Sequence, residues 1–255
     1  MNKNLDFVLT KIKITFKENK EYKFNLWSGI FTNIFIVLVL VLFWSVFSNL
    51  TSEIIKWDFN NFILYSVLTL AGTKSYFLFC IRRLNMFLIS GELNLVLSKP
   101  INSILYLFLQ KLTAQELVIF PILITVSGIL VLNGVYTNYL FAIFVFIFGM
   151  FFHSLVISTI ECLAFFMKNN LFLYEFYSDL KYSLRHFTPK MYENLSFAFY
   201  YFPTSFSGYF VIEILKGRTD LILSMSFNLF IISFIFILIL IYLFKFGLKR
   251  YEAFG

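Results

Sequence analysis

Four ionisable side chains and a tyrosine recur at helical spacing within one stretch of the chain. Glu175 and Asp179 are four residues apart, so on a helix they share one face, where Asp179 also reaches Tyr182. Lys181 and Arg185 repeat the same spacing as a second stripe. In a membrane span, each ionisable group costs roughly 2.5–3.5 kcal/mol at a lipid-facing centre, so these residues would have to line a polar substrate path. On a cytoplasmic helix, they would be an ordinary solvated face.

Motifs for enzymatic chemistry are missing from the sequence. There is no G-x-x-x-x-G-K-[ST] loop to hold nucleotide phosphates and no H-E-x-x-H zinc motif. His153 and His186 are isolated, and the run 205–208 has Ser where an intramembrane serine protease has its first Gly. Cys80 and Cys162 lack metal-ligand spacing. We therefore expect no catalytic residue, metal or cofactor in this chain.

The composition is that of a membrane protein. Of 255 residues, 60% are hydrophobic and 14% are charged, whereas soluble domains are about 25% charged. Mean hydropathy is +0.81. The net charge of +7 is spread among separate segments rather than gathered on one face, which argues against nucleic-acid binding.

Apolar stretches close to membrane-spanning length recur along the chain. A span needs about 20 apolar residues. The segments that fit are roughly 30–47, 62–81, 115–133, 139–163 and 221–244. Residues 1–26 instead combine an apolar stripe with several lysines, and we expect an amphipathic helix in the membrane interface. Glu116 and Glu161 fall near span ends, where we expect interface-level charges rather than a proton relay.

The region after the fourth span admits two topologies. In the first, 168–188 is the fifth span and 190–216 is an extracellular re-entrant segment. In the second, 168–190 is a cytoplasmic amphipathic helix and 191–215 is the fifth span. Both predict an all-α membrane protein of six transmembrane helices, forming a single domain over 1–255.

Basic residues predict the orientation, because cytoplasmic segments are enriched in Lys and Arg. With both termini in the cytoplasm, that side holds 14 of the 21 basic residues. They are Lys3, Lys11, Lys13, Lys17, Lys20, Lys23, Arg82, Arg83, Lys99, Lys111, Lys168, Lys245, Lys249 and Arg250. Only Lys56, Lys190, Lys216 and Arg218 fall in the outer loops.

Three short segments resemble one transporter family. The run from Arg83 to Pro100, R-L-N-M-F-L-I-S-G-E-L-N-L-V-L-S-K-P, is similar to the R…I-x-x-G-x-L-D-x-L-L-x-x-P signature of bacterial type-2 ABC exporter permeases, with Asn94 at the acidic position. The stretch 189–215 resembles that family's proline- and tyrosine-containing segment before the last span. The ending 247–255, G-L-K-R-Y-E-A-F-G, resembles its C-terminal motif.

The resemblance implies that 82–102 is a cytoplasmic coupling segment, with a coupling helix over 84–99 seated on an ATPase. Its candidate residues are Arg82, Arg83, Gly91, Glu92, Leu93, Lys99 and Pro100. The alternative from the residues alone is a solvated loop whose arginines only fix the topology. The resemblance also implies that ATP and Mg bind to a separate ATPase subunit. A second permease subunit, identical or related, would complete the transporter.

The function implied is export of a hydrophobic or amphipathic substrate by alternating access in the bacterial inner membrane. An ion-gradient-driven secondary transporter is the alternative, although the two halves show no internal repeat. An intramembrane enzyme lacks its motifs. A plain membrane anchor would not need the mixed basic segment between the second and third spans.

Overall fold

The computed structural model describes residues 3–21, 23–74, 80–110, 112–167, 170–218 and 220–251, and these ranges contain helices but no strand. The helices are α1 (Lys3–Glu21), α2 (Lys23–Ile55), α3 (Phe59–Lys74), α4 (Leu84–Ile89), α5 (Leu93–Leu97), α6 (Ser103–Gln110), α7 (Ala114–Leu132), α8 (Tyr139–Cys162), η2 (Leu163–Phe165), α9 (Leu171–His186), η3 (Pro189–Leu195), α10 (Ser196–Tyr200), α11 (Pro203–Ser207), α12 (Tyr209–Leu215) and α13 (Asp220–Arg250).

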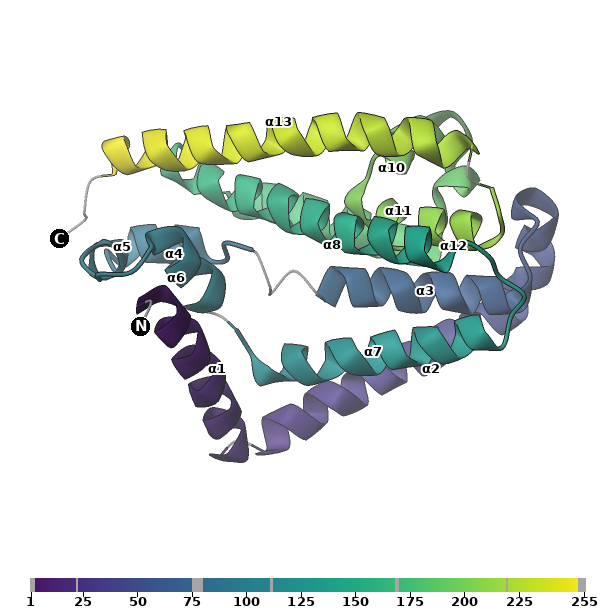
Figure 1. Cartoon of the computed structure of the whole chain (residues 1–255), viewed down its shortest axis with the longest axis horizontal. Helices are drawn as coiled ribbons and strands as arrows, with labels where there is room; N and C mark the ends of the chain where they lie inside the picture. Colours follow the sequence, from purple (N-terminus) through teal and green to yellow (C-terminus); the bar gives the residue numbers. More distant parts are fainter. Residues whose placement is uncertain are drawn as a thin grey trace.

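The long helices lie roughly side by side and form an elongated bundle (Figure 1). One end, which we call the basal end, holds α4, α5, α6, the start of α1 and the end of α13. The opposite, distal end holds the turn 133–138 between α7 and α8, together with α12.

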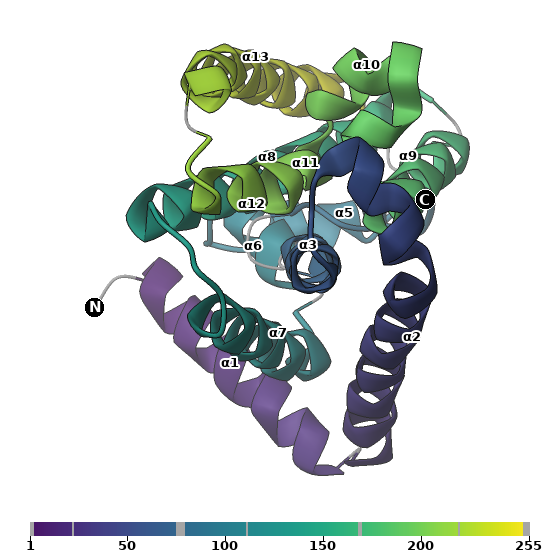
Figure 2. The ribbon, with the colours of Figure 1, turned by 90° about the vertical axis from the view of Figure 1, so that its right-hand side faces the viewer.

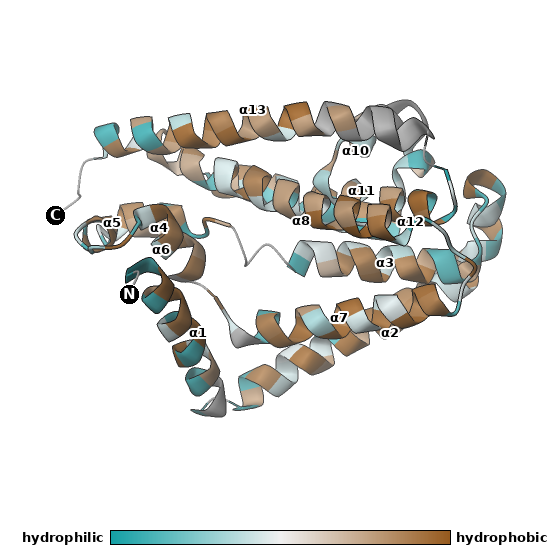
Figure 3. Cartoon of the chain, viewed as in Figure 1, coloured by the Kyte–Doolittle hydropathy of each residue, from teal (hydrophilic) through white to brown (hydrophobic). Residues whose placement is uncertain are grey.

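Four helices in the described ranges are long and apolar enough to cross a membrane. They are Lys23–Ile55, Gln115–Leu132, Tyr139–Phe165 and Phe230–Arg250. Figure 3 shows these helices as largely hydrophobic, whereas α1 alternates between hydrophilic and hydrophobic residues. The helices predicted over 115–133 and 139–163 are confirmed to within about a residue at each end.

Helix α3 occupies the centre of the bundle, and Figure 2 shows it nearly end-on among α2, α7, α8 and α12. Every residue from Asn61 to Thr73 is buried, and the indole of Trp44 donates to Ser66 Oγ at 2.7 Å. The predicted span 62–81 was too long. Helix α3 is described to Lys74, residues 75–79 lie outside the described ranges, and residues 80–83 are not helical.

Helix α9 packs antiparallel to α8. Asn170 before α9 donates to the carbonyl of Ile160 at 3.0 Å, and further along Tyr177 meets His153 at 2.5 Å. Near its end, the Leu184 carbonyl accepts a hydrogen bond from Tyr65 of α3. The second predicted topology needed one continuous span over 191–215, but that stretch is broken into short helices.

The short helix α11 lies between α3 and α8, and glycines allow the close approach. A Cβ on Gly149 of α8 would meet the backbone nitrogen of Ser207 at 2.7 Å. A Cβ on Gly72 of α3 would meet Ser207 Cβ at 2.4 Å. The chain then returns along α12 to the distal end, where Thr137 donates its amide to the Leu215 carbonyl at 2.8 Å.

Candidate functional site

The segment 82–102 forms two short helices rather than one. Helices α4 and α5 are separated by Gly91, whose φ of +72° lies in the left-handed region that glycine adopts at no steric cost. The single coupling helix predicted over 84–99 is therefore wrong in detail. Gly91 stands at the turn inside the element.

This helical pair packs against the ends of the long helices at the basal end. Its inner side chains, Leu84, Phe87, Leu93 and Val96, are buried in a small core. That core also contains Cys162 of α8 and Phe244 of α13. The pair and two long helices thus share one close-packed core, and close-packed interiors deform little.

The outer side of the pair is exposed and apolar. We call this surface the apolar tip, and its residues are Met86, Ile89, Leu95 and Leu97. Ile89 is 64% exposed and Leu95 is 65% exposed. Large exposed apolar side chains at one end of a rigid element are typical of a protein interaction site.

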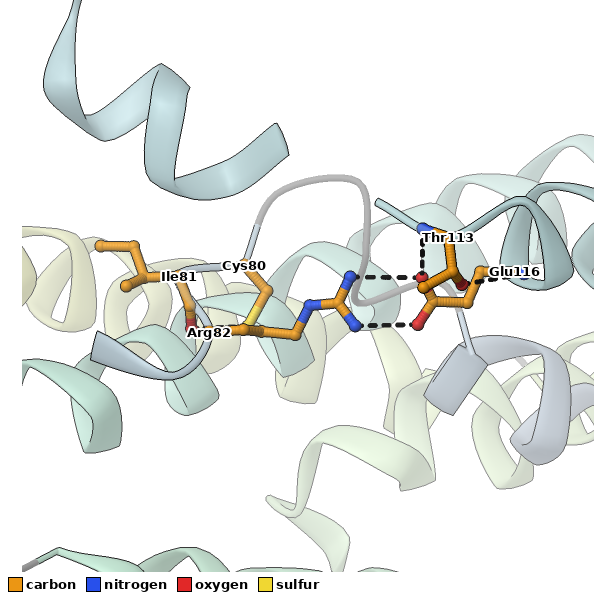
Figure 4. A network of polar contacts seen from close by, with 5 residues as sticks. All are labelled: Cys80, Ile81, Arg82, Thr113 and Glu116. Atoms are coloured by element: carbon orange, nitrogen blue, oxygen red, sulfur yellow. Dashed lines mark hydrogen bonds and ion pairs between the residues drawn. The ribbon is translucent and has the colours of Figure 1, made fainter. Parts of the chain in front are cut away.

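Arg82 fixes the start of the segment to α7. Its guanidinium forms two contacts with the Glu116 carboxylate, at 2.8 and 3.2 Å (Figure 4). Glu116 also belongs to a capping box with Thr113 at the first turn of α7. One carboxylate therefore holds both the helix start and the segment, and a two-point Arg contact is directionally specific.

Glu161 fixes the other side of the segment to α8. It is buried, and its Oε2 accepts the amide of Leu84 at 3.0 Å, with the amides of Arg83 and Asn85 also directed at the carboxylate. Helix α4 has no side-chain cap from its own N-cap residue, so Glu161 supplies the missing acceptor. The sequence analysis missed this role, because no local signal links residues so far apart.

The other predicted coupling residues lie on the surface of the pair. Arg83 has a φ of +60° and is exposed, as is Glu92 at the N-cap of α5. Lys99 is exposed and donates from Nζ to the Tyr106 hydroxyl at 2.7 Å. Pro100 is exposed just after α5. Glu92 and Lys99 are thus placed close to the apolar tip.

The predicted path residues do not converge on one cavity. Glu175, Asp179 and Tyr182 are exposed on the outer face of α9. Arg185 is half-buried and, with Lys181, lies over the Tyr182 ring, at 5.1 and 5.0 Å from its centroid. The basic stripe of Lys181 and Arg185 is therefore half-buried, whereas the acidic stripe is exposed.

A cavity of about 540 Å³ lies between α7 and α8, and its walls are almost entirely apolar. Its lining includes Phe120, Gly128, Phe146 and Met150, and none of the predicted path residues. Among the described residues, no three His, Cys, Asp or Glu side chains are close enough to hold a metal ion. The cavity can accept an apolar chain, but it offers no charged group for catalysis.

Comparison with known families agrees with this geometry. Residues 34–255 match the family described as ABC-2 family transporter protein, a range that begins within α2 and includes the helical pair and the later long helices. No curated protein and no solved structure matches the chain.

Proposed function

We propose that this chain, which belongs to the ABC-2 family of transporter proteins, is the permease of an ATP-driven exporter in the bacterial inner membrane. ATP and Mg bind to a separate ATPase subunit. The partner's nucleotide cycle drives alternating access in the permease, which moves a hydrophobic or amphipathic substrate outward.

The observation that supports this proposal most directly is the anchored helical pair with its apolar tip. A permease that receives work from a soluble ATPase needs a rigid element that projects from the bundle and is tied to the spans. The Arg82–Glu116 ion pair and the Glu161 contact tie α4 to two different long helices. The apolar tip then seats in the ATPase, and the neighbouring Glu92 and Lys99 pair with its polar rim.

The topology of this proposal has six spans, with both termini in the cytoplasm. Helices α3 and α9 add to the four long spans, and at 16 residues each they extend about 24 Å, which suits helices inside a bundle. The antiparallel packing of α9 on α8 supports its role as the fifth span. The segment 190–216 then re-enters from the outer side, and Arg82, Arg83, Lys99 and Lys249 face the cytoplasm.

A second permease subunit, identical or related, covers the outer face of α9. This face exposes Glu175 and Asp179 next to Phe172 and Phe176. Carboxylates are costly against lipid, so a polar path between two subunits accounts for them better than a lipid-facing surface does. The apolar cavity between α7 and α8 suits the hydrophobic part of a substrate or a lipid chain.

The first test is copurification of the ATPase with the tagged chain expressed from its own operon. Replacing Ile89 or Leu95 with Asp places a charge in the apolar tip, and we expect ATPase recovery to fall tenfold or more. The matched control is Val135→Asp at the distal end, whose apolar side chain is likewise exposed. This control should leave recovery unchanged.

The same measurement can overturn the proposal. Recovery of the chain without any ATPase, together with transport that depends on an ion gradient, would establish the secondary transporter instead. Equal loss of the ATPase in Val135→Asp would show that the apolar tip is not the docking surface.

A further inference from the structure

Three basic side chains lie on two packed helices, α3 and α9. Lys74 is the last described residue of α3, and Lys181 and Arg185 are on α9, which packs against α3. Lys181 and Arg185 are four residues apart on α9, and both lie over the Tyr182 ring, at 5.0 and 5.1 Å from its centroid. The charge of Lys74 acts on both of them. We call these residues the basic cluster.

The basic cluster lies partway along the bundle. Lys181 is one helical turn beyond Tyr177, whose hydroxyl contacts His153 in the middle of α8. At the end of α9, the ring of His186 lies 5.7 Å from Phe43 of α2. Figure 2 shows α2 and α9 on the same side of α3. The cluster therefore lies beside α3 on the side that α2 and α9 share.

The described part of the chain provides no carboxylate dedicated to this cluster. None of its three members forms an ion pair among the described side chains, and the buried Nε of Arg185 has no hydrogen-bond partner. The carboxylate that acts on Lys74 is Glu116, which already binds Arg82 through both oxygens. Glu175 and Asp179 lie on the other, exposed face of α9.

Clustered cations without a counter-charge are unfavourable in a membrane, because burial and mutual repulsion both disfavour the charged forms. The cost is removed when an anion binds among them. Arginine and lysine together can bind a phosphate or carboxylate. The guanidinium donates two parallel hydrogen bonds to the anion's oxygens, and the ammonium adds a compact positive charge. The half-burial of all three side chains leaves them accessible to such a group.

We propose that Lys74, Lys181 and Arg185 form a binding site for the anionic headgroup of an amphipathic molecule. The ligand's phosphate or carboxylate binds the three cations, and its tail follows the apolar surface near Phe43. As a cargo site this rests on the proposed function, because it assigns an anionic class to the exported substrate. A resident anionic phospholipid would supply the same headgroup chemistry.

The test is direct binding of dodecyl phosphate to the purified, delipidated full-length chain, measured by native mass spectrometry. The double variant Lys181→Gln/Arg185→Gln should lower the affinity tenfold or more. Lys74→Gln should lower it as well, because the site is built from two helices, and Lys181→Arg should retain most of it. The matched control Lys245→Gln/Lys249→Gln, at the end of α13, should change it less than twofold.

The source of the anion is decided in two further arms. If the wild-type chain extracted from membranes retains phosphatidylglycerol and the double variant does not, the ligand is a resident lipid. If dodecyl phosphate binds in the presence of excess phosphatidylglycerol, the ligand is a diffusible cargo. Both results uphold the anion site.

The proposal is overturned by unchanged dodecyl phosphate affinity in a Lys74→Gln/Lys181→Gln/Arg185→Gln chain, or by equal loss in the control. A melting temperature within a few degrees of wild type shows that each variant is folded. No ATPase is present in this assay, so its failure is distinct from failure of the copurification test.

Discussion

At the scale of single residues, two glutamates at span ends perform different structural tasks. Glu116 caps the helix in which it lies and binds Arg82. Glu161 lies at the end of α8 and caps α4, which begins 77 residues earlier in the chain. The sequence predicted interface-level charges at these positions, and the contacts show what the two carboxylates hold together. Each joins the helical pair to a span.

We expect Glu161→Ala to loosen the start of α4. Loss of a cap typically costs about 1 kcal/mol, so amide exchange at Leu84 and Asn85 should become about fivefold faster. Hydrogen–deuterium exchange of the purified chain measures this directly. Glu175→Ala, which removes an exposed carboxylate of α9, is the control and should leave those amides unchanged. Equal protection in Glu161→Ala would show that α4 does not depend on this cap.

At the scale of elements, α11 can lie between α3 and α8 only because two of the facing residues are glycines. Any side chain at Gly149 would collide with the backbone of Phe206 and Ser207, which cannot rotate away. Helical glycine lowers helix stability. Its presence in α8 is therefore explained by the close approach of α11 and not by helix formation.

Gly149→Ala should lower the free energy of unfolding by about 1–3 kcal/mol, the usual cost of overpacking a core. Gly128→Ala is the matched control, because it is also within a helix and has no atom within 4 Å of its added Cβ. We expect it to be neutral or to add up to about 1 kcal/mol. Unfolding by SDS titration measures both. A stable Gly149→Ala chain would mean that α11 moves aside easily.

At the scale of the whole molecule, the proposed exporter gives separate roles to the basal end and to the outer face of α9. In that proposal the basal end binds the ATPase, and the α9 face meets the second permease subunit. Cys80 and Cys162 are both buried, so an introduced surface cysteine can report on subunit contacts with little background.

If the second permease subunit is an identical copy, Phe176→Cys should form a dimer linked by a disulfide between the two introduced thiols when membranes are treated with a mild oxidant. The side chain is 56% exposed on the α9 face. Phe144→Cys is the control, since it is similarly exposed on α8. Gel electrophoresis and mass spectrometry identify the adduct. Equal yields from the two variants would contradict a subunit interface at α9.

The sequence by itself was sufficient for the long apolar helices. Helices α2, α7, α8 and α13 are recognised because a helix that faces lipid must be apolar on its surface. Such a helix appears in the sequence as a continuous run of apolar residues. The basic residues between spans predicted an orientation by the same local logic. The helical pair was located by its motif, although its division at Gly91 was not foreseen.

Tertiary structure decided the elements whose surroundings are protein. Helix α3 is buried by its neighbours. Helix α9 carries charges but packs beside α8, because Tyr177 and Asn170 form hydrogen bonds to α8. The Glu161 cap and the basic cluster of Lys74, Lys181 and Arg185 join residues that are distant along the chain. Composition reports what solvent a segment can face, whereas packing alone determines which side chains meet.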